Sequence, residues 1–150
     1  MKLKLVGTVA ACVLLTACKT SFNGELADGN AIPGSYAELQ QKVKNHAYFA
    51  LNSSSLDHQA QGNLDQVADW SKQNPDTALT VEGHCDPRGT REYNLQLGER
   101  RAVAAKKHLA ARGAAGSINT VSYGKDRLPA GPGADEESYA LNRVAIVNPS

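Results

Sequence analysis

One acid and one base flank a turn in the sequence, and their types suit the binding of a zwitterion. Asp86 lies in the segment CDPRG (85–89), whose proline and glycine favour a tight turn. Arg101 lies on the adjoining predicted helix, seven residues after Asn94, so these two side chains share one helical face. A carboxylate binds ammonium groups, and a guanidinium binds carboxylates through paired hydrogen bonds. The spacing leaves open the alternative that Asp86 and Arg101 form a structural salt bridge with each other.

The elements on either side of this turn have clear patterns. Residues 78–84 alternate between two faces, which predicts a strand, and residues 91–112 predict a long helix that ends at Gly113. The turn therefore lies between the carboxyl end of a strand and a helix, where α/β folds tend to bind ligands. Small and apolar residues recur along the predicted buried face of the helix, namely Leu95, Gly98, Ala102, Ala105 and Leu109. Gly98 and the alanines predict close packing of the helix against a sheet.

The remaining elements alternate in type along the chain. A short helix is predicted to begin after Ser35, with Glu38 at the capping-box position, and a second helix extends over about 56–71 and stops at Pro75. Further strands are predicted over 46–51, 118–124 and 142–147, with a loop rich in glycine and proline over 125–138. The resulting βαβαββ order predicts an α/β (α+β) two-layer sandwich, with helices packed on a small mixed sheet.

The first residues of the chain have the features of a secretory signal. Two lysines precede an apolar run over 5–17, which is too short to span a bilayer as a helix. The segment LTAC, which ends at Cys18, resembles the lipobox of bacterial lipoproteins. That resemblance implies a signal peptide over 1–17 and a lipid on Cys18, the alternative being an ordinary signal with an incidental cysteine. Residues 18–34 are polar with no apolar period, which predicts a flexible tether, and residues 35–150 form one domain.

Composition excludes several classes of function. The net charge is +1, and it becomes −1 when the two lysines leave with the signal, so nothing predicts a nucleic-acid partner. After removal of the signal and lipidation, Cys85 is the remaining cysteine, which leaves no pair for an intrachain disulfide. The four histidines are scattered and no CxxC pattern occurs, so we expect no metal site and no cofactor.

The segment from Val81 to Leu109 resembles the core motif of the OmpA-like peptidoglycan-binding domain, in particular that of peptidoglycan-associated lipoproteins. The resemblance extends over about residues 48–147 and includes Asn142 and Arg143 near its end. The matching positions of the core motif are Gly83, His84, Asp86, Gly89, Tyr93, Asn94, Leu97, Gly98, Arg101 and Ala102. The resemblance implies the fold of that domain and a binding protein rather than an enzyme.

The resemblance also implies a ligand, the meso-diaminopimelate side chain of the peptidoglycan stem peptide. Asp86 takes the role of the residue that binds its ammonium, and Arg101 that of the residue that binds its carboxylate. Asn94 and Leu97 correspond to residues that line the same pocket. Phe49 and Ala50 are candidates for one wall, mainly through their backbone.

The chain departs from the family near this wall, and two neighbouring residues are open to other interpretations. Ala50 and Asn52 stand where the family usually has acids, which favours weaker or altered binding. His84 either braces the turn through hydrogen bonds or touches ligand, and Cys85 is either a small filler or a modifiable thiol. An enzyme that uses His84, Cys85 and Asp86 is a further alternative, but neighbouring residues of a strand point in opposite directions, so His84 and Cys85 are badly placed to act together.

The resulting hypothesis is an outer-membrane lipoprotein that faces the periplasm, binds peptidoglycan and tethers the membrane to the cell wall. Lys19 differs from the aspartate that retains many lipoproteins at the inner membrane. The resemblance also suggests TolB and TolA as partners within a Tol–Pal system. The alternative is a cell-wall anchor, or structural component, of a secretion machine.

Overall fold

The structure is a computed structural model that describes residues 31–150. The predicted signal peptide (1–17), Cys18 and most of the predicted tether (18–34) lie outside the described residues. Between residues 31 and 150, no helix is both long and apolar enough to cross a membrane. The predictions for residues 1–30 stay predictions.

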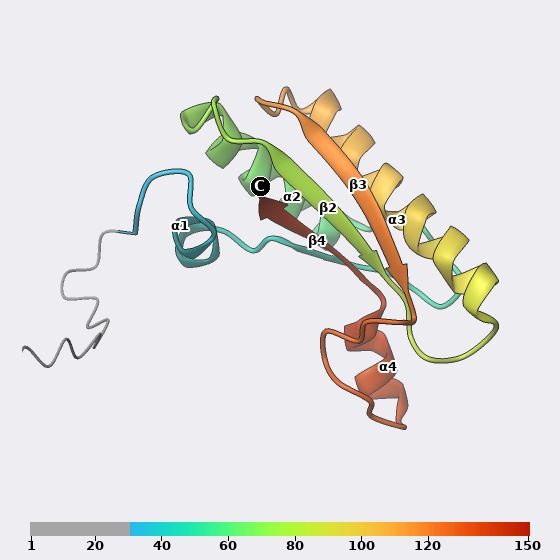
Figure 1. Ribbon diagram of the computed structural model, residues 1–150. Helices are drawn as coiled ribbons and strands as arrows, with labels where there is room; N and C mark the ends of the chain where they lie inside the picture. Colours follow the sequence, from blue (N-terminus) through green and yellow to red (C-terminus); the bar gives the residue numbers. More distant parts are fainter. Residues whose placement is uncertain (1–30) are drawn as a thin grey trace, which may run out of the picture.

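Four strands form one mixed sheet (Figure 1). The strands are β1 (His46–Tyr48), β2 (Leu79–His84), β3 (Ile118–Gly124) and β4 (Val144–Pro149). They lie in the order β1-β4-β2-β3, with β4 antiparallel to both of its neighbours and β2 parallel to β3. The last strand of the chain therefore lies inside the sheet, and the two ends of the described domain are held together through it.

Four helices accompany the sheet: α1 (Tyr36–Lys42), α2 (His58–Gln73), α3 (Arg91–Ala111) and α4 (Glu136–Asn142). Each begins after a residue whose side chain accepts a hydrogen bond from a backbone N–H of the first turn, and these N-caps are Ser35, Asp57, Thr90 and Asp135. Helices α2 and α3 cover one face of the sheet, whereas α4 lies beyond the carboxyl ends of β2 and β3 (Figure 1).

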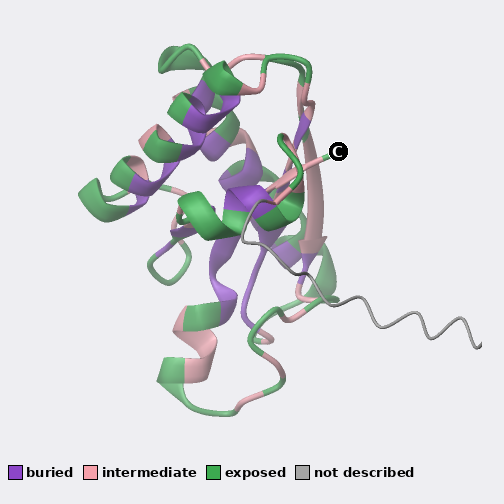
Figure 2. Ribbon diagram, turned by 90° about the vertical axis from the view of Figure 1, so that its left-hand side faces the viewer, coloured by how far each residue is buried: buried purple, intermediate pink, exposed green. Residues whose placement is uncertain are grey.

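The hydrophobic core lies between these two helices and the sheet (Figure 2). Leu64 and Val67 of α2, Leu109 of α3, and Val81 and Val147 of the central strands are fully buried. Along β2, buried residues alternate with half-buried ones, as predicted from the sequence. The alternation leaves one face of the strand for the helices, which is the physical basis of the two layers.

Glycines allow α3 to lie close to the sheet. A Cβ atom on Gly83 of β2 would lie 1.9 Å from the carbonyl oxygen of Gly98 on α3. A Cβ atom on Gly98 would lie 2.3 Å from the hydroxyl oxygen of Ser122 on β3. Neither position has space for a larger side chain, so the predicted close packing is confirmed. This contact sets the height of α3 above the end of β2, where the turn with Asp86 begins.

The predicted two-layer class is confirmed, but the region before the last strand was predicted wrongly. Helix α4 (Glu136–Asn142) occupies the end of the predicted loop, and Asn142 ends this helix instead of beginning a strand. A helix of 7 residues is too short to give a clear apolar period, and such helices depend on tertiary contacts. Strand β1 is also shorter than predicted and ends at Tyr48.

The predicted buried face of α3 is correct toward its C-terminus and wrong near its start. Gly98, like the alanines and Leu109 after it, is buried, but Leu95 is 41% exposed. Leu97 and Asn94 are buried in its place. The Asn94 side chain is turned toward the loop before the helix, where it donates to the Arg88 carbonyl, so the burial near the start of α3 does not follow the predicted stripe.

Candidate functional site

The turn between β2 and α3 is held from both sides. The Cys85 N–H donates to a carbonyl of β3 over 2.8 Å, which extends the pairing of β2 with β3. The Asn94 side-chain amide, on α3, donates to the Arg88 carbonyl over 2.7 Å and to that of the helix N-cap over 2.9 Å. Gly89 adopts a φ of +87°, in the left-handed region that glycine enters without steric cost. These contacts fix the direction of the Asp86 side chain.

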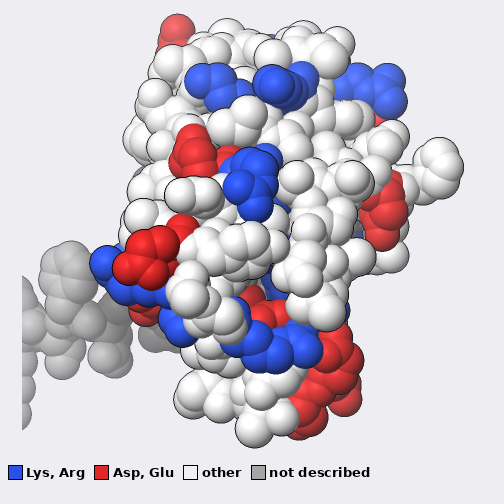
Figure 3. Space-filling view, turned by 90° about the vertical axis from the view of Figure 1, so that its right-hand side faces the viewer, with Lys and Arg blue, Asp and Glu red and all other residues white. Residues whose placement is uncertain are grey.

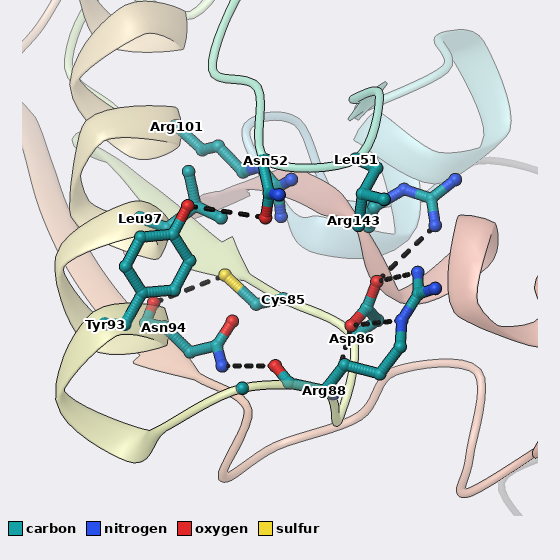
Figure 4. Close-up of a pocket in the computed structure, with 11 residues that line it drawn as sticks. Leu51, Asn52, Cys85, Asp86, Arg88, Tyr93, Asn94, Leu97, Arg101 and Arg143 are labelled. Carbon is teal, nitrogen blue, oxygen red and sulfur yellow. Dashed lines mark hydrogen bonds and ion pairs between the residues drawn. The ribbon is translucent and has the colours of Figure 1, made fainter.

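A cavity of about 190 Å³ opens between this turn, α3 and the loop after β1 (Figure 4). Figure 3, which shows one side of the molecule, has a hollow in its lower half with both basic and acidic side chains around it. The cavity is lined by Leu51, Asn52, Cys85, Asp86, Arg88, Gly89, Tyr93, Asn94, Leu97, Arg101 and Arg143. Three arginines and one aspartate give this lining an excess of positive charge.

Asp86 is 5% exposed and is bound by two arginines. Its Oδ1 accepts hydrogen bonds from the backbone N–H of Arg88, over 3.1 Å, and from Arg88 Nε, over 3.2 Å. Its Oδ2 lies 2.7 Å from Arg88 Nη2 and 3.5 Å from Arg143 Nη1. Burial raises the pKa of Asp86, but the hydrogen bonds and charge of Arg88 outweigh burial and place the pKa below its ordinary value. Asp86 is therefore an ionised carboxylate at neutral pH.

Arg101 is fully buried and donates to three backbone carbonyls. Its Nε donates to Ser53 over 2.8 Å, its Nη1 to His84 over 2.9 Å, and its Nη2 to Ala50 over 3.2 Å. The guanidinium also lies over the Phe49 ring, 5.2 Å from the centroid. Burial lowers the pKa of Arg101 from its usual high value. Among residues 31–150, no carboxylate forms an ion pair with Arg101.

The structure brings four of the predicted site residues together and places two behind the cavity wall. Asp86, Asn94, Leu97 and Arg101 all line the cavity. Phe49 and Ala50 do not line it, and they act through their carbonyls. The Phe49 carbonyl accepts from Arg143 Nε over 3.0 Å, and the Ala50 carbonyl accepts from Arg101. The predicted wall therefore positions two arginines of the site.

Arg143 is a site residue whose role the sequence reasoning missed, although it was noted as part of the family resemblance. It is 8% exposed, and its Nη1 lies 2.8 Å from Glu136 Oε1 as well as 3.5 Å from Asp86. Helix α4 supplies Glu136, and Arg143 follows directly after that helix. No local spacing links these residues to Asp86, because the strand β4 that follows them enters the middle of the sheet.

The loop after β1 forms the opposite rim of the cavity. Leu51 is 52% exposed there, and Asn52 adopts a positive φ of 54°. Asparagine tolerates this left-handed conformation better than most residues, which gives Asn52 a structural role in the turn. Its side-chain oxygen accepts a hydrogen bond from the Tyr93 hydroxyl over 3.3 Å, so the loop is joined to α3 across the cavity mouth.

His84 and Cys85 point into different surroundings. His84 Nδ1 lies 3.0 Å from the Arg127 carbonyl, so this side chain braces the loop after β3. The Cys85 thiol is 1% exposed and donates to the Asn94 carbonyl over 3.3 Å. Burial raises the pKa of Cys85, an effect that the nearby Arg101 only partly offsets. A buried thiol of this kind fills space, and no hydrogen bond joins it to the His84 ring among the described residues.

The part of the chain from residue 31 onward contains no cluster of three or more histidine, cysteine, aspartate or glutamate residues arranged to hold a metal ion. The charged side chains on the cavity lining are those of Arg88, Arg101, Arg143 and Asp86. An arrangement of this kind can bind an organic ion that has both a cationic and an anionic group, because each sign of charge is available on the lining.

Residues 48–143 match the OmpA family. The chain is 41% identical over 122 residues to the peptidoglycan-associated lipoprotein of Rhizobium meliloti (strain 1021). This match covers 81% of this chain and 69% of the relative. It is also 41% identical over 147 residues to the peptidoglycan-associated lipoprotein of Pasteurella multocida (strain Pm70), which covers 97% of this chain and 94% of the relative.

Solved structures agree with these sequence relatives. The crystal structure of the peptidoglycan-associated lipoprotein from Burkholderia pseudomallei is 38% identical, with a TM-score of 0.67 over 71% of this chain and 91% of that chain. The C-terminal domain of Helicobacter pylori MotB shares the fold at 18% identity, with a TM-score of 0.65 over 71% of this chain and 84% of that chain. The relatives at 38–41% identity are all named peptidoglycan-associated lipoproteins. From its sequence, its fold and the residues around its cavity, this chain belongs to the OmpA family.

Proposed function

We propose that this protein is an outer-membrane lipoprotein that faces the periplasm and binds peptidoglycan stem peptides non-covalently. The ligand group is the free end of meso-diaminopimelate, which carries one ammonium and one carboxylate. The names of the relatives, peptidoglycan-associated lipoproteins, support the polymer, and the charges of the cavity support the group on it.

The main support for the proposal is the hydrogen bonding of the buried Arg101 guanidinium. A guanidinium has five N–H groups, and three nitrogens of Arg101 each direct one N–H to a backbone carbonyl. One further N–H remains on each of Nη1 and Nη2, with no hydrogen bond to any residue from 31 to 150. A buried charge without a counter-ion is costly, and a ligand carboxylate that accepts both N–H groups removes that cost.

Asp86 supplies the second half of the binding site. Its carboxylate is ionised and lies on the same cavity as Arg101, so it can accept hydrogen bonds from an ammonium. Leu97 also lines the cavity, and its apolar side chain suits contact with the methylene chain of a diamino acid. A ligand with only one of the two charges gains from only one of the two residues.

The predicted lipid on Cys18 completes the role of a tether. A lipid in the outer membrane and reversible binding to the cell wall act together, because the anchored domain is held near the wall at a high effective concentration. Residues 18–34 form the proposed linker, which spans on the order of 20–25 Å as a flexible coil. The bound wall and the membrane thus stay joined while single contacts open and close.

Binding to peptidoglycan is compatible with both of the cellular roles that the sequence analysis suggested. In a Tol–Pal-like role the domain also engages TolB and TolA, and in a secretion machine it anchors that machine to the wall. The names of the relatives favour the first role. Crosslinking in intact cells, followed by mass spectrometry of the captured proteins, distinguishes the two.

The binding test uses fluorescence anisotropy with the full chain in detergent and a labelled tripeptide, L-alanyl-γ-D-glutamyl-meso-diaminopimelate. We expect saturable binding by the natural sequence, and loss of binding in Asp86→Asn and Arg101→Lys. Lysine keeps the positive charge but cannot form the paired hydrogen bonds of a guanidinium.

Two exposed residues provide matched controls. Arg100→Lys changes the neighbouring arginine on α3, and Asp126→Asn changes an aspartate that pairs with Arg91 at the surface. Both are expected to bind the tripeptide as the natural sequence does. Absence of binding by the natural sequence, or full binding by both site variants, contradicts the proposed function.

A further inference from the structure

Four charged side chains form a closed ring at one end of the cavity. Arg88 Nη2 lies 2.7 Å from Asp86 Oδ2, and Arg88 Nη1 lies 3.3 Å from Glu136 Oε2. Arg143 Nη1 lies 2.8 Å from Glu136 Oε1 and 3.5 Å from Asp86 Oδ2. Each acid of the ring therefore contacts both arginines, and each arginine contacts both acids.

The two arginines of the ring differ in how firmly they are held. The Arg143 side chain is 9% exposed and is fixed by its hydrogen bond to the Phe49 carbonyl. The Arg88 side chain is 40% exposed, and its other contacts are with Glu136 and with the Tyr139 ring, 4.4 Å from the centroid. Arg88 can therefore leave Asp86 and keep two partners on α4, whereas Arg143 cannot move without breaking a buried contact.

Arg88 occupies the Asp86 carboxylate, which is the group that would bind a cationic ligand. Its side chain donates to both oxygens of Asp86. An ammonium that approached Asp86 while Arg88 stayed in place would meet a like charge at close range. Binding of a cation at Asp86 thus requires that the Arg88 side chain move away.

We propose that Arg88 is a built-in competitor for the ligand ammonium, and that it transfers from Asp86 to Glu136 when the ligand binds. This inference rests on the proposed function and specifies which side chain the ligand displaces at that site. Displacement of Arg88 costs an ion pair, so an ammonium alone gains little at Asp86. A ligand that also places a carboxylate on Arg101 gains a second interaction that offsets the displacement. Arg88 therefore lowers the affinity for every ligand that brings an ammonium to Asp86, and a zwitterionic end offsets this loss through its interaction with Arg101.

The test compares two labelled tripeptides on the full chain in detergent. The first ends in meso-diaminopimelate, and the second has L-lysine in its place, which keeps the ammonium and lacks the side-chain carboxylate. Removal of the competitor in Arg88→Gln is expected to tighten binding of the first by about threefold or more, since partly exposed ion pairs are worth up to roughly a fivefold change in an equilibrium. Binding of the lysine tripeptide is expected to gain by a similar factor, because the same displacement of Arg88 is no longer needed.

Glu136→Gln provides the opposite change. It removes the group that accepts Arg88, so Arg88 stays on Asp86 and binding of the diaminopimelate tripeptide weakens. In the double variant Arg88→Gln/Glu136→Gln, the loss caused by the glutamate change is expected to disappear, because no competitor remains to be moved. Arg91→Gln is the control, since it removes the same charge from a surface pair with Asp126.

The outcomes separate this inference from the proposed function. Weaker or unchanged binding in a folded Arg88→Gln overturns the competitor and leaves the site intact, because Arg88 then contacts the ligand or is neutral to it. The competitor role of Arg88 is also overturned if Arg88→Gln and Glu136→Gln shift the affinity in the same direction. Absence of binding by the natural sequence and by every variant overturns both the inference and the proposed function.

Discussion

Asp86 and Arg101 line the same cavity, yet no ion pair joins them. Asp86 is bound by Arg88 and Arg143, whereas Arg101 donates to two backbone carbonyls of the loop after β1 and to that of the residue that ends β2. The salt bridge that the sequence left open as an alternative is thus absent from the described residues. The separation leaves a negative and a positive group available to one ligand.

Arg101→Lys is expected to destabilise the fold as well as abolish binding. A lysine has one nitrogen and cannot reach the carbonyls of Ser53, His84 and Ala50 together, so at least one buried acceptor loses its partner. We expect the free energy of unfolding to fall by about 1–3 kcal/mol. Urea unfolding followed through Trp70 fluorescence measures this change. An equal loss in Arg100→Lys, at an exposed position, would show that the effect is not specific to the buried contacts.

Gly98→Ala is expected to weaken the packing of α3 on the sheet. The added methyl group would lie 2.3 Å from Ser122 Oγ and 2.9 Å from the Gly83 carbonyl, so helix or strand must shift. The expected cost is about 1–3 kcal/mol of the free energy of unfolding. Gly62→Ala on α2 is the matched control, since its methyl group meets nothing within 4 Å. That variant should gain up to about 1 kcal/mol from helix propensity, and a loss at Gly62 similar to that at Gly98 would refute the packing argument.

Asp86→Asn is expected to change how stability depends on pH. The pKa of Asp86 is lower in the folded state than the unfolded value of about 3.9, so its contribution is present above about pH 4 and is lost as pH falls through the folded pKa. The natural sequence should therefore lose more stability than Asp86→Asn between about pH 5 and about pH 2. Urea midpoints across this range measure the difference. Parallel curves for the two proteins would mean that Asp86 is not stabilised as an anion.

Cys85 is expected to be unreactive in the folded protein. Its thiol is buried and its pKa is raised by burial, so little thiolate is present or accessible at neutral pH. Iodoacetamide should modify the peptide that contains Cys85 slowly in buffer and rapidly in urea, as measured by mass spectrometry. Fast modification under native conditions would contradict the interpretation of Cys85 as a filler and would reopen its role as a modifiable thiol.

The sequence determined the elements with long or strict patterns. The alternation of β2, the helix from Arg91, the glycine at the helix–sheet contact and the turn with Asp86 follow from local rules of periodicity, capping and steric size. These rules act within a few residues, so one segment of sequence is enough to state them. They also placed Asn94 and Arg101 on one face of the helix that follows the turn with Asp86, whereas Leu97 was assigned to the pocket by the family resemblance.

The tertiary structure alone decided the partners of those residues. Helix α4 is too short to give a clear period. Arg143 reaches Asp86, and Glu136 reaches Arg143, only because β4 enters the sheet between β1 and β2. The complete burial of Arg101 depends on a loop about 50 residues earlier in the chain, whose carbonyls accept its hydrogen bonds. Such contacts have no signature in spacing, because the energy of a buried charge is set by the groups that the fold places around it and not by its neighbours in sequence.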